Sequence, residues 1–464
     1  MDEPRSADAA AISGGRAQEQ AAPPRLSRAA LIAVAALTVL PVLHIAVYLA
    51  GYLVNVPWWD EYDESVALAV KAVTGSLTLR DLFMSTNGHV IFFTNVITVL
   101  STYFLHWYVP LGSWISFGLT IVNLVILVDL LRRDAPRVAW VAAPVFSLLV
   151  FSIRQVFNWQ FAFQTQWLFL LTWFLLGLWT LRTRPVGWRP LIAAAVFSLC
   201  ATFSFSLGVL AWFVLAAVMG VMGYRRRGYF LVWALAAAAA CGAYFWVRIP
   251  PSLPTTTDPL VLIQYSLILL GSPLVWGNTV IAALLAILVM GITAVNLVYL
   301  GGRMPLRGLA VWGALVVFAL AAAVATAYGR AFFLSQHIDP IQPMEGRYVS
   351  VSMLLWIAAA ALALMSLDRF AGETSPRWKK LLGRADVVFL GILLGAHLIV
   401  TVYFYQYPAP APSLVQHWQV ACLETYPQTG DQNCLQGLHP DKSVSGKGIE
   451  DLAKYHLALF ADRP

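Results

Sequence analysis

Four carboxylates crowd into one short stretch of the chain, where they could take a proton from a reacting hydroxyl. The stretch, WWDEYDE, carries them directly after two tryptophans, as Asp60, Glu61, Asp63 and Glu64. The chain has only 23 acidic residues in 464, and neighbouring carboxylates raise each other's pKa. Such a group suits a general base, with Trp59 shaping its pocket. The alternative interpretation is an exposed loop that the two indole rings anchor at a lipid interface.

Amides, together with one histidine and one arginine, form a second set of polar residues. Asn87-Gly88-His89 precedes an apolar segment, where Asn87 either caps a helix or, with His89, binds a sugar. Between residues 154 and 166 lie one arginine and five amides, namely Arg154, Gln155, Asn158, Gln160, Gln164 and Gln166. A single Gln in a span can simply bond to a neighbouring helix. This density instead predicts a polar cavity, in which Gln160 and Gln164 bind sugar.

A third set of polar residues precedes a late apolar run and could bind an anion. It contains Arg330, His337 and the sequence MEGRY, which ends in Arg347 and Tyr348. A guanidinium at the mouth of a helix can bind two phosphate oxygens at once, although an arginine there can also simply reach lipid headgroups. Carboxylates and guanidiniums together suit a reaction between a hydroxyl and a phosphate ester. The carboxylate accepts the proton, and the arginine stabilises the leaving phosphate.

The composition of the chain requires a membrane around the elements that position these groups. Hydrophobic residues make up 59% and charged residues 11%, with a mean hydropathy of +0.72, whereas soluble domains carry about 25% charged residues. Apolar runs of about 20 residues recur, and each can cross the hydrocarbon layer as a helix. We therefore predict an all-α polytopic membrane protein with about eleven spans, at residues 30–53, 112–131, 138–153, 161–181, 189–205, 206–223, 228–247, 277–299, 308–328, 350–367 and 386–405.

The basic residues orient these spans. Most of the 30 Lys and Arg residues fall between spans on one side, which the positive-inside rule assigns to the cytoplasm. The N-terminus is then inside and the C-terminus outside. The chain divides into a disordered cytoplasmic tail, a membrane domain and a small extracytoplasmic segment, at residues 1–28, 29–405 and 406–464. The outer face carries a first loop with an interfacial helix and two later loops, at residues 54–111, 248–276 and 329–349.

The cysteines and the overall charge narrow the choice of partners. Cys422 and Cys434 fall in the outer segment, where oxidation is permitted, and we expect them to form a disulfide. No CxxC pair or histidine cluster has the spacing of a structural metal site. The net charge of +7 serves orientation, so we expect no nucleic-acid partner. Arg outnumbers Lys 24 to 6, which is typical of a GC-rich bacterial genome and indicates a bacterial inner membrane.

The order of these motifs resembles the GT-C superfamily of membrane glycosyltransferases, which use polyprenyl-phosphate sugars. The similarity is clearest over residues 30–181, where one span leads into the acidic pair Asp60-Glu61. A segment opening with His89 follows, NGHVIFFTNVITVLSTYFL, and then an inward span ending in ILVDLLRR. Protein mannosyltransferases and lipid A aminoarabinose transferases share this order. The sequence departs from that family at the turn FSFS, residues 203–206, where members often carry an acidic residue or Lys.

The resemblance implies roles for individual residues. Asp60 would be the general base and Glu61 would orient it or the acceptor. Arg347 and Tyr348 would bind the phosphate of the sugar donor, with Arg330 or Arg154 as helpers. The acceptor or sugar would be bound by a further set, consisting of His89, Asn87, Trp59, Asp63, Gln160, Gln164 and His337. A divalent ion at Glu61, Asp63 and Glu64 is compatible with the resemblance, but we expect neither a metal nor another cofactor.

The function expected from this resemblance is an inverting sugar transfer outside the membrane. The sugar would leave a polyprenyl phosphate and join a hydroxyl of a glycan, glycolipid or protein, on a monomeric enzyme surrounded by lipid. Two alternatives remain open. One is a transporter or flippase of a lipid-linked glycan, because polar residues lie within spans, and the other is transfer of a polymer from a diphosphate.

Overall fold

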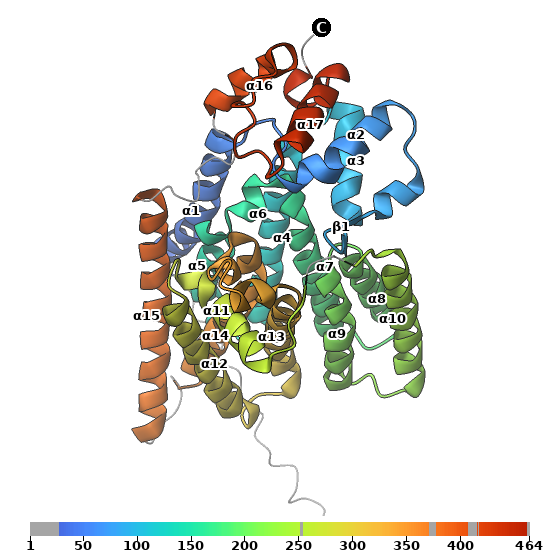
Figure 1. Cartoon of the computed structure of the whole chain (residues 1–464). Coiled ribbons are helices and arrows are strands. Elements are labelled where there is room, and N and C mark those ends of the chain that lie inside the picture. Colours follow the sequence, from blue (N-terminus) through green and yellow to red (C-terminus); the bar gives the residue numbers. More distant parts are fainter. Residues whose placement is uncertain (1–26, 251–253, 371–376, 407–414, 416, 462–464) are drawn as a thin grey trace, which may run out of the picture.

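Helices make up most of the described chain. The computed structural model describes residues 27–250, 254–370, 377–406, 415 and 417–461. A bundle of long helices carries a smaller layer of short helices at one end, the upper end in Figure 1. All but the last two residues of the predicted cytoplasmic tail lie outside the described residues.

Seven helices of the described residues are long and apolar enough to cross a membrane. Their bounds are α1 (Arg28–Tyr52), α4 (Pro110–Asp134), α10 (Arg227–Val247), α12 (Thr279–Gly301), α13 (Leu306–Ser335), α14 (Gly346–Phe370) and α15 (Arg377–Gln406). Their backbone groups are bonded within each helix, as a hydrocarbon environment demands. The chain is therefore an all-α polytopic membrane protein.

The other four predicted spans fall on shorter helices. These are α5 (Ala139–Val150), α7 (Thr165–Thr183), α8 (Trp188–Thr202) and α9 (Val209–Met222). Two short helices, α6 (Phe157–Gln160) and η4 (Ala162–Gln164), precede α7, which therefore begins four residues later than predicted. Gly208 lets α8 and α9 meet closely, since a Cβ there would lie 1.9 Å from the carbonyl oxygen of Ala201.

Two predicted outer loops contain helix instead. Residues 248–276 include α11 (Pro259–Gly271), which is too short to be read as a span but packs against α12, α13 and α14. A Cβ at Gly271 would lie 1.7 Å from the carbonyl oxygen of Ala282, so the missing side chain lets the two helices touch. The loop predicted at residues 329–349 is shorter in the structure, because α13 continues to Ser335.

Helix α14 occupies the middle of the bundle. Its apolar stretch is entirely buried, and the helix contacts α5, α11, α12, α13 and α15 (Figure 1). The run of alanines at residues 358–361 explains this position, because small side chains let neighbouring helices approach closely. The first turn of this central helix carries Arg347 and Tyr348.

The upper layer has its own apolar core. It contains α2 (Val66–Val73), α3 (Phe92–Leu105), α16 (His417–Thr429) and α17 (Lys442–Lys454). Tyr62 and Val66 pack there with Leu423, Leu435 and Ile449, so the first outer loop and the C-terminal segment fold as one unit. A disulfide joins Cys422 to Cys434 within this layer.

The structure differs in detail from the interfacial helix predicted within residues 54–111. Asn87 does not cap a helix: Asn87 and Gly88 have φ of +48° and +81° and form the turn between β1 (Ser85–Thr86) and β2 (His89–Val90). An Asn-Gly pair with two positive φ values is the usual two-residue hairpin turn. Helix α3 starts only at Phe92, whose N–H donates to the carbonyl of Phe203, 2.9 Å away.

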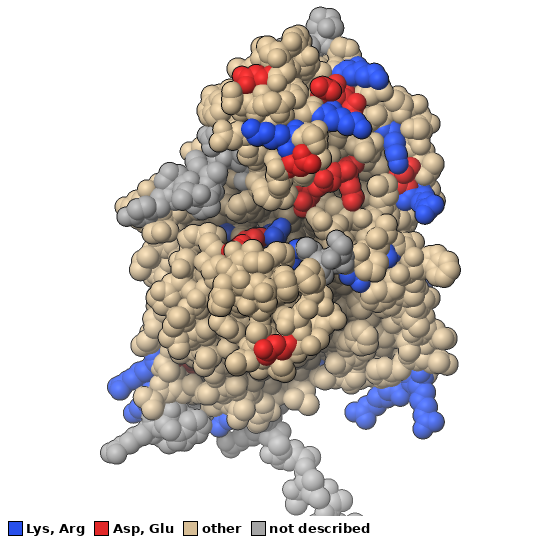
Figure 2. All heavy atoms as spheres, in the orientation of Figure 1, with Lys and Arg blue, Asp and Glu red and all other residues tan. Residues whose placement is uncertain are grey.

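Charged side chains are distributed unevenly along the molecule. In Figure 2, Lys and Arg project from the lower end of the bundle and also lie on the upper layer, where most of the visible Asp and Glu are found. The surface is hollowed between the layer and the bundle, and charges of both signs meet in this hollow.

Candidate active site

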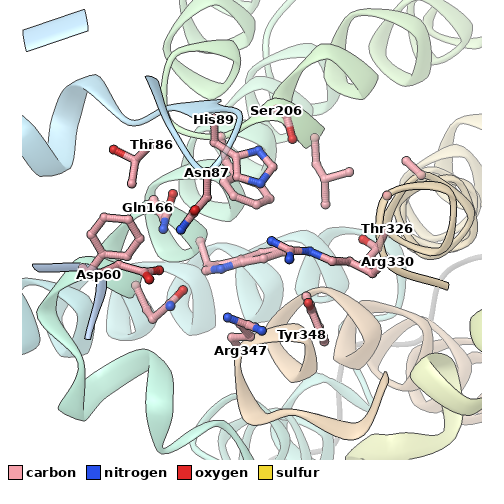
Figure 3. Close-up of a pocket in the computed structure, with 17 residues that line it drawn as sticks. Asp60, Thr86, Asn87, His89, Gln166, Ser206, Thr326, Arg330, Arg347 and Tyr348 are labelled. Carbon is pink, nitrogen blue, oxygen red and sulfur yellow. The ribbon is translucent and has the colours of Figure 1, made fainter. Parts of the chain in front are cut away.

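A cavity of about 100 Å³ lies between the upper layer and the bundle. Six separate segments of the sequence supply its walls, and Figure 3 shows their side chains around the cavity. The lining residues are Asp60, Thr86, Asn87, His89, Phe163, Gln164, Gln166, Trp167, Phe205, Ser206, Leu207, Ala325, Thr326, Gly329, Arg330, Arg347 and Tyr348. Seven residues predicted from the sequence therefore share one cavity: Asp60, Asn87, His89, Gln164, Arg330, Arg347 and Tyr348.

Asp60 reaches the cavity because the backbone turns sharply just before it. Trp59 has a φ of +51°, and its N–H donates to the carbonyl of Leu438 over 2.7 Å. Asp60 then directly precedes the π-helical turn η1 (Glu61–Ser65). Burial raises the pKa of the Asp60 carboxyl above its usual range, and the positive charge of Arg347 opposes this shift. A carboxylate with a raised pKa is a better proton acceptor.

Arg347 enters the cavity from the first turn of α14. Its guanidinium lies 2.5 Å from the Glu345 carboxylate, while its buried Nε has no hydrogen-bond partner among the described residues. The preceding Gly346 packs against the chain at Arg154, and a Cβ there would lie 2.9 Å from the Arg154 carbonyl oxygen. The Asn158 side chain donates to the carbonyl of Arg347 over 3.3 Å. These contacts fix the backbone position of Arg347.

Arg154 supports this segment from behind rather than lining the cavity. Its buried guanidinium donates to the carbonyl of Met344 over 2.8 Å and lies 4.5 Å from the ring centre of Trp276. Ser350 of α14 donates to Gln155 over 2.7 Å. Much of the predicted polar cavity at residues 154–166 is therefore a set of contacts that holds the start of α14.

Arg330 is the second guanidinium of the cavity. It lies on the part of α13 that extends beyond the predicted span, one turn after Thr326. Within the described residues it has no hydrogen-bond acceptor and no carboxylate within ion-pair distance. A cation without a protein partner in a cavity can bind an anionic group without first breaking an existing pair. Figure 3 shows Arg330 and Arg347 directed toward the space that Asp60 also faces.

His89 forms an uncharged part of the wall. Its ring packs on Phe205, with 4.1 Å between ring centroids, and Phe205 packs on Trp167 at 4.2 Å. Burial lowers the pKa of His89 to about 3, and the positive charges of Arg330 and Arg248 act in the same direction. The neutral ring leaves its buried Nδ1 without a partner among the described residues, so it can exchange a hydrogen bond with a ligand hydroxyl.

The other three acids of the WWDEYDE stretch face different partners. Glu61 is buried outside the cavity and accepts from the N–H of Trp58 over 2.8 Å. Burial raises its pKa to about 8. Glu64 accepts from the hydroxyl of Thr86, and Asp63 lies 3.3 Å from His439. Glu61, Asp63 and Glu64 thus do not converge, and among the acids of this stretch only Asp60 lines the cavity.

Other predicted site residues lie elsewhere. Trp59 is partly exposed, and Gln160 donates to the Tyr48 hydroxyl over 2.9 Å. His337 is an exposed turn residue with a φ of +54°. Among the described residues, Cys422, Asp431 and Cys434 lie close enough to hold a metal. The disulfide, however, occupies both sulfurs, so they are not available as thiolate ligands.

Part of the cavity lining was not predicted from the sequence. Phe205, Ser206 and Leu207 line the cavity from the turn between α8 and α9, where the sequence departs from the family pattern. Thr326 and Gly329 interrupt an otherwise apolar run, and that interruption was a usable signal.

Comparisons with protein families, curated proteins and solved structures found no match. Fold and site together define a polytopic α-helical membrane protein with a mixed-charge cavity at one end of its bundle.

Proposed function

We propose that this chain is an inverting glycosyltransferase that moves a sugar from a polyprenyl phosphate to an acceptor hydroxyl. The observation that carries the proposal is that the buried Asp60 carboxylate shares one cavity with the guanidiniums of Arg347 and Arg330, and Arg330 has no partner among the described residues. Glu345 pairs with Arg347, whereas Arg330 has no carboxylate within ion-pair distance among the described residues. Arg330 can therefore attract an anionic ligand such as a phosphate ester.

The mechanism follows from these charges. Asp60 accepts the proton of the acceptor hydroxyl as its oxygen attacks the anomeric carbon of the sugar. The bond from that carbon to the phosphate oxygen breaks on the opposite face, which inverts the configuration. Arg330 and Arg347 stabilise the phosphate charge that develops. Neutral groups such as His89 and Gln164 bind sugar hydroxyls, while the aromatic surface of Phe205 and Trp167 packs against the ring.

The setting of the cavity suits a lipid-linked sugar. It lies where the bundle meets the upper layer, so a lipid phosphate at the membrane surface can reach it while its chain remains in the bilayer. The positive-inside rule places this end outside the cytoplasm, where a disulfide is stable. The corresponding location is the outer face of a bacterial inner membrane, with a glycan, glycolipid or protein as acceptor.

The test uses the full-length protein reconstituted in vesicles with radiolabelled polyprenyl-phosphate sugars and a cell-envelope fraction as acceptor. Wild-type protein should transfer label and release polyprenyl phosphate. Asp60→Asn should fold and lose at least a hundredfold in turnover, since general base catalysis contributes about 10²–10⁴. Asp258→Asn is the matched control, because Asp258 is exposed and does not line the cavity, and an asparagine can keep its role as the N-cap of α11.

Full activity of Asp60→Asn would refute the assignment of the base. Movement of a lipid-linked glycan across the vesicle membrane, without a new glycosidic bond, would support the flippase alternative instead.

A further inference from the structure

The turn between α16 and α17 contacts the loop that carries Asp60. The carbonyl of Leu438 accepts from the N–H of Trp59 over 2.7 Å, and that of Gly437 accepts from the Trp58 indole over 3.0 Å. Next to them, the His439 ring nitrogen lies 3.3 Å from the Asp63 carboxylate. Three consecutive residues of the C-terminal segment therefore hold both sides of Asp60.

The Cys422–Cys434 disulfide ties this turn to α16. Cys434 is completely buried and lies in the same apolar core as Leu435 and Leu438. Cys422 lies in α16, twelve residues earlier, and is only partly buried. Because Leu438 follows Cys434 by four residues, the bridge limits the movement of the carbonyl that holds Trp59.

The loop also contacts the membrane bundle and helix α17. The Trp58 ring lies 5.0 Å from the Phe161 ring, centroid to centroid, next to the start of α7. Helix α17 approaches Tyr62 so closely that a Cβ at Gly448 would lie 2.6 Å from the tyrosine ring. The Asp60 loop is thus enclosed between the membrane bundle and the C-terminal segment.

We propose that the C-terminal segment is a working part of the catalytic site. Cys434 and His439 are positioning residues that act through the Trp58–Asp63 loop, and turnover requires the Cys422–Cys434 disulfide to be intact. This inference rests on the proposed function. It assigns to residues 417–461 the placement of the base, in addition to any contact with an acceptor.

The experiment reduces the reconstituted wild-type protein with a water-soluble phosphine, alkylates the thiols and confirms both alkylations by mass. Turnover should fall at least tenfold, while KM for the polyprenyl-phosphate sugar changes less than twofold, because Arg330 and Arg347 are not moved. Hydrogen exchange at the peptide containing Trp59 should accelerate. The Cys422→Ser/Cys434→Ser variant should show the same low turnover with and without reductant.

A second set of variants does not touch the disulfide. His439→Ala should lower kcat about fivefold or more, and His439→Gln should restore most of it, since the amide can still donate to Asp63. His456→Ala is the matched control, because His456 is exposed on the same segment. Equal effects of His439→Ala and His456→Ala, or full turnover after verified reduction, would overturn the inference.

Failure of the proposed function would give a different result from failure of this inference. No sugar donor would then give product with the wild-type protein, but the exchange measurement would still report on the loop. Unchanged protection of the Trp59 amide after reduction would overturn the positioning role independently of any activity.

Discussion

Replacing Arg330 by alanine isolates what one guanidinium contributes to ligand binding. Arg330 has no protein partner within the described residues, so its removal leaves no buried charge behind. Arg347→Ala, in contrast, would leave the Glu345 carboxylate, now 2.5 Å away, without its partner. The melting temperature of Arg330→Ala should therefore match that of the wild type, because substitutions that break no contact change stability by about 0.5 kcal/mol or less.

The effect on transfer follows from the phosphate contact that Arg330 is proposed to make. A hydrogen bond to a charged group contributes about 1.5–3 kcal/mol, and about 1.36 kcal/mol corresponds to a factor of ten in rate. Arg330→Ala should thus lower kcat/KM by about 10- to 150-fold. Arg330→Lys keeps the charge but loses the paired N–H groups of the guanidinium. Its kcat/KM should therefore lie between that of the wild type and that of Arg330→Ala.

The assay is transfer from a labelled polyprenyl-phosphate sugar in vesicles, with kcat and KM determined separately and stability followed by thermal scanning. Arg80→Ala is the control, because Arg80 is an exposed arginine of the upper layer that does not line the cavity. If Arg330→Ala retains kcat/KM within threefold of wild type at unchanged stability, the phosphate assignment is refuted.

Two further predictions concern backbone packing and pH. Gly346→Ala places a Cβ 2.9 Å from the Arg154 carbonyl oxygen and should cost about 1–3 kcal/mol; an unchanged melting temperature would contradict this contact. The pKa of Glu61 is raised from 4.5 to about 8 in the folded protein. The folded state therefore holds a proton that the unfolded state has lost, and stability should fall as pH rises through that window. Glu61→Gln should flatten that slope in melting curves recorded between pH 4.5 and 8, and an identical slope in both proteins would refute the burial argument.

The elements of the fold were largely predictable, because long apolar runs have few alternatives to a membrane helix. All eleven predicted spans coincide with helices, and seven of these meet the length and composition of a span. Helix α11, which has thirteen residues, was not predicted. Its position depends on contacts with α12 and α13 that the local sequence does not encode.

The cavity was predictable only where residue type carries the chemistry. Asp60, Arg330 and Arg347 could be selected because charge is rare in this chain. The separation of Asp60 from Glu61 was not predictable, because it depends on the positive φ of Trp59 and a hydrogen bond to Leu438, almost 380 residues away. The contribution of Phe205 likewise requires packing between distant helices.

The hydrogen bond between Trp59 and Leu438 cannot form until residue 438 has been synthesised. Asp60 leaves the ribosome early, long before the carbonyl that will hold it has been made. Asp60, Arg330 and Arg347 have all been synthesised before Leu438. The contacts between the C-terminal segment and the Asp60 loop can therefore form only after almost the whole chain has been made.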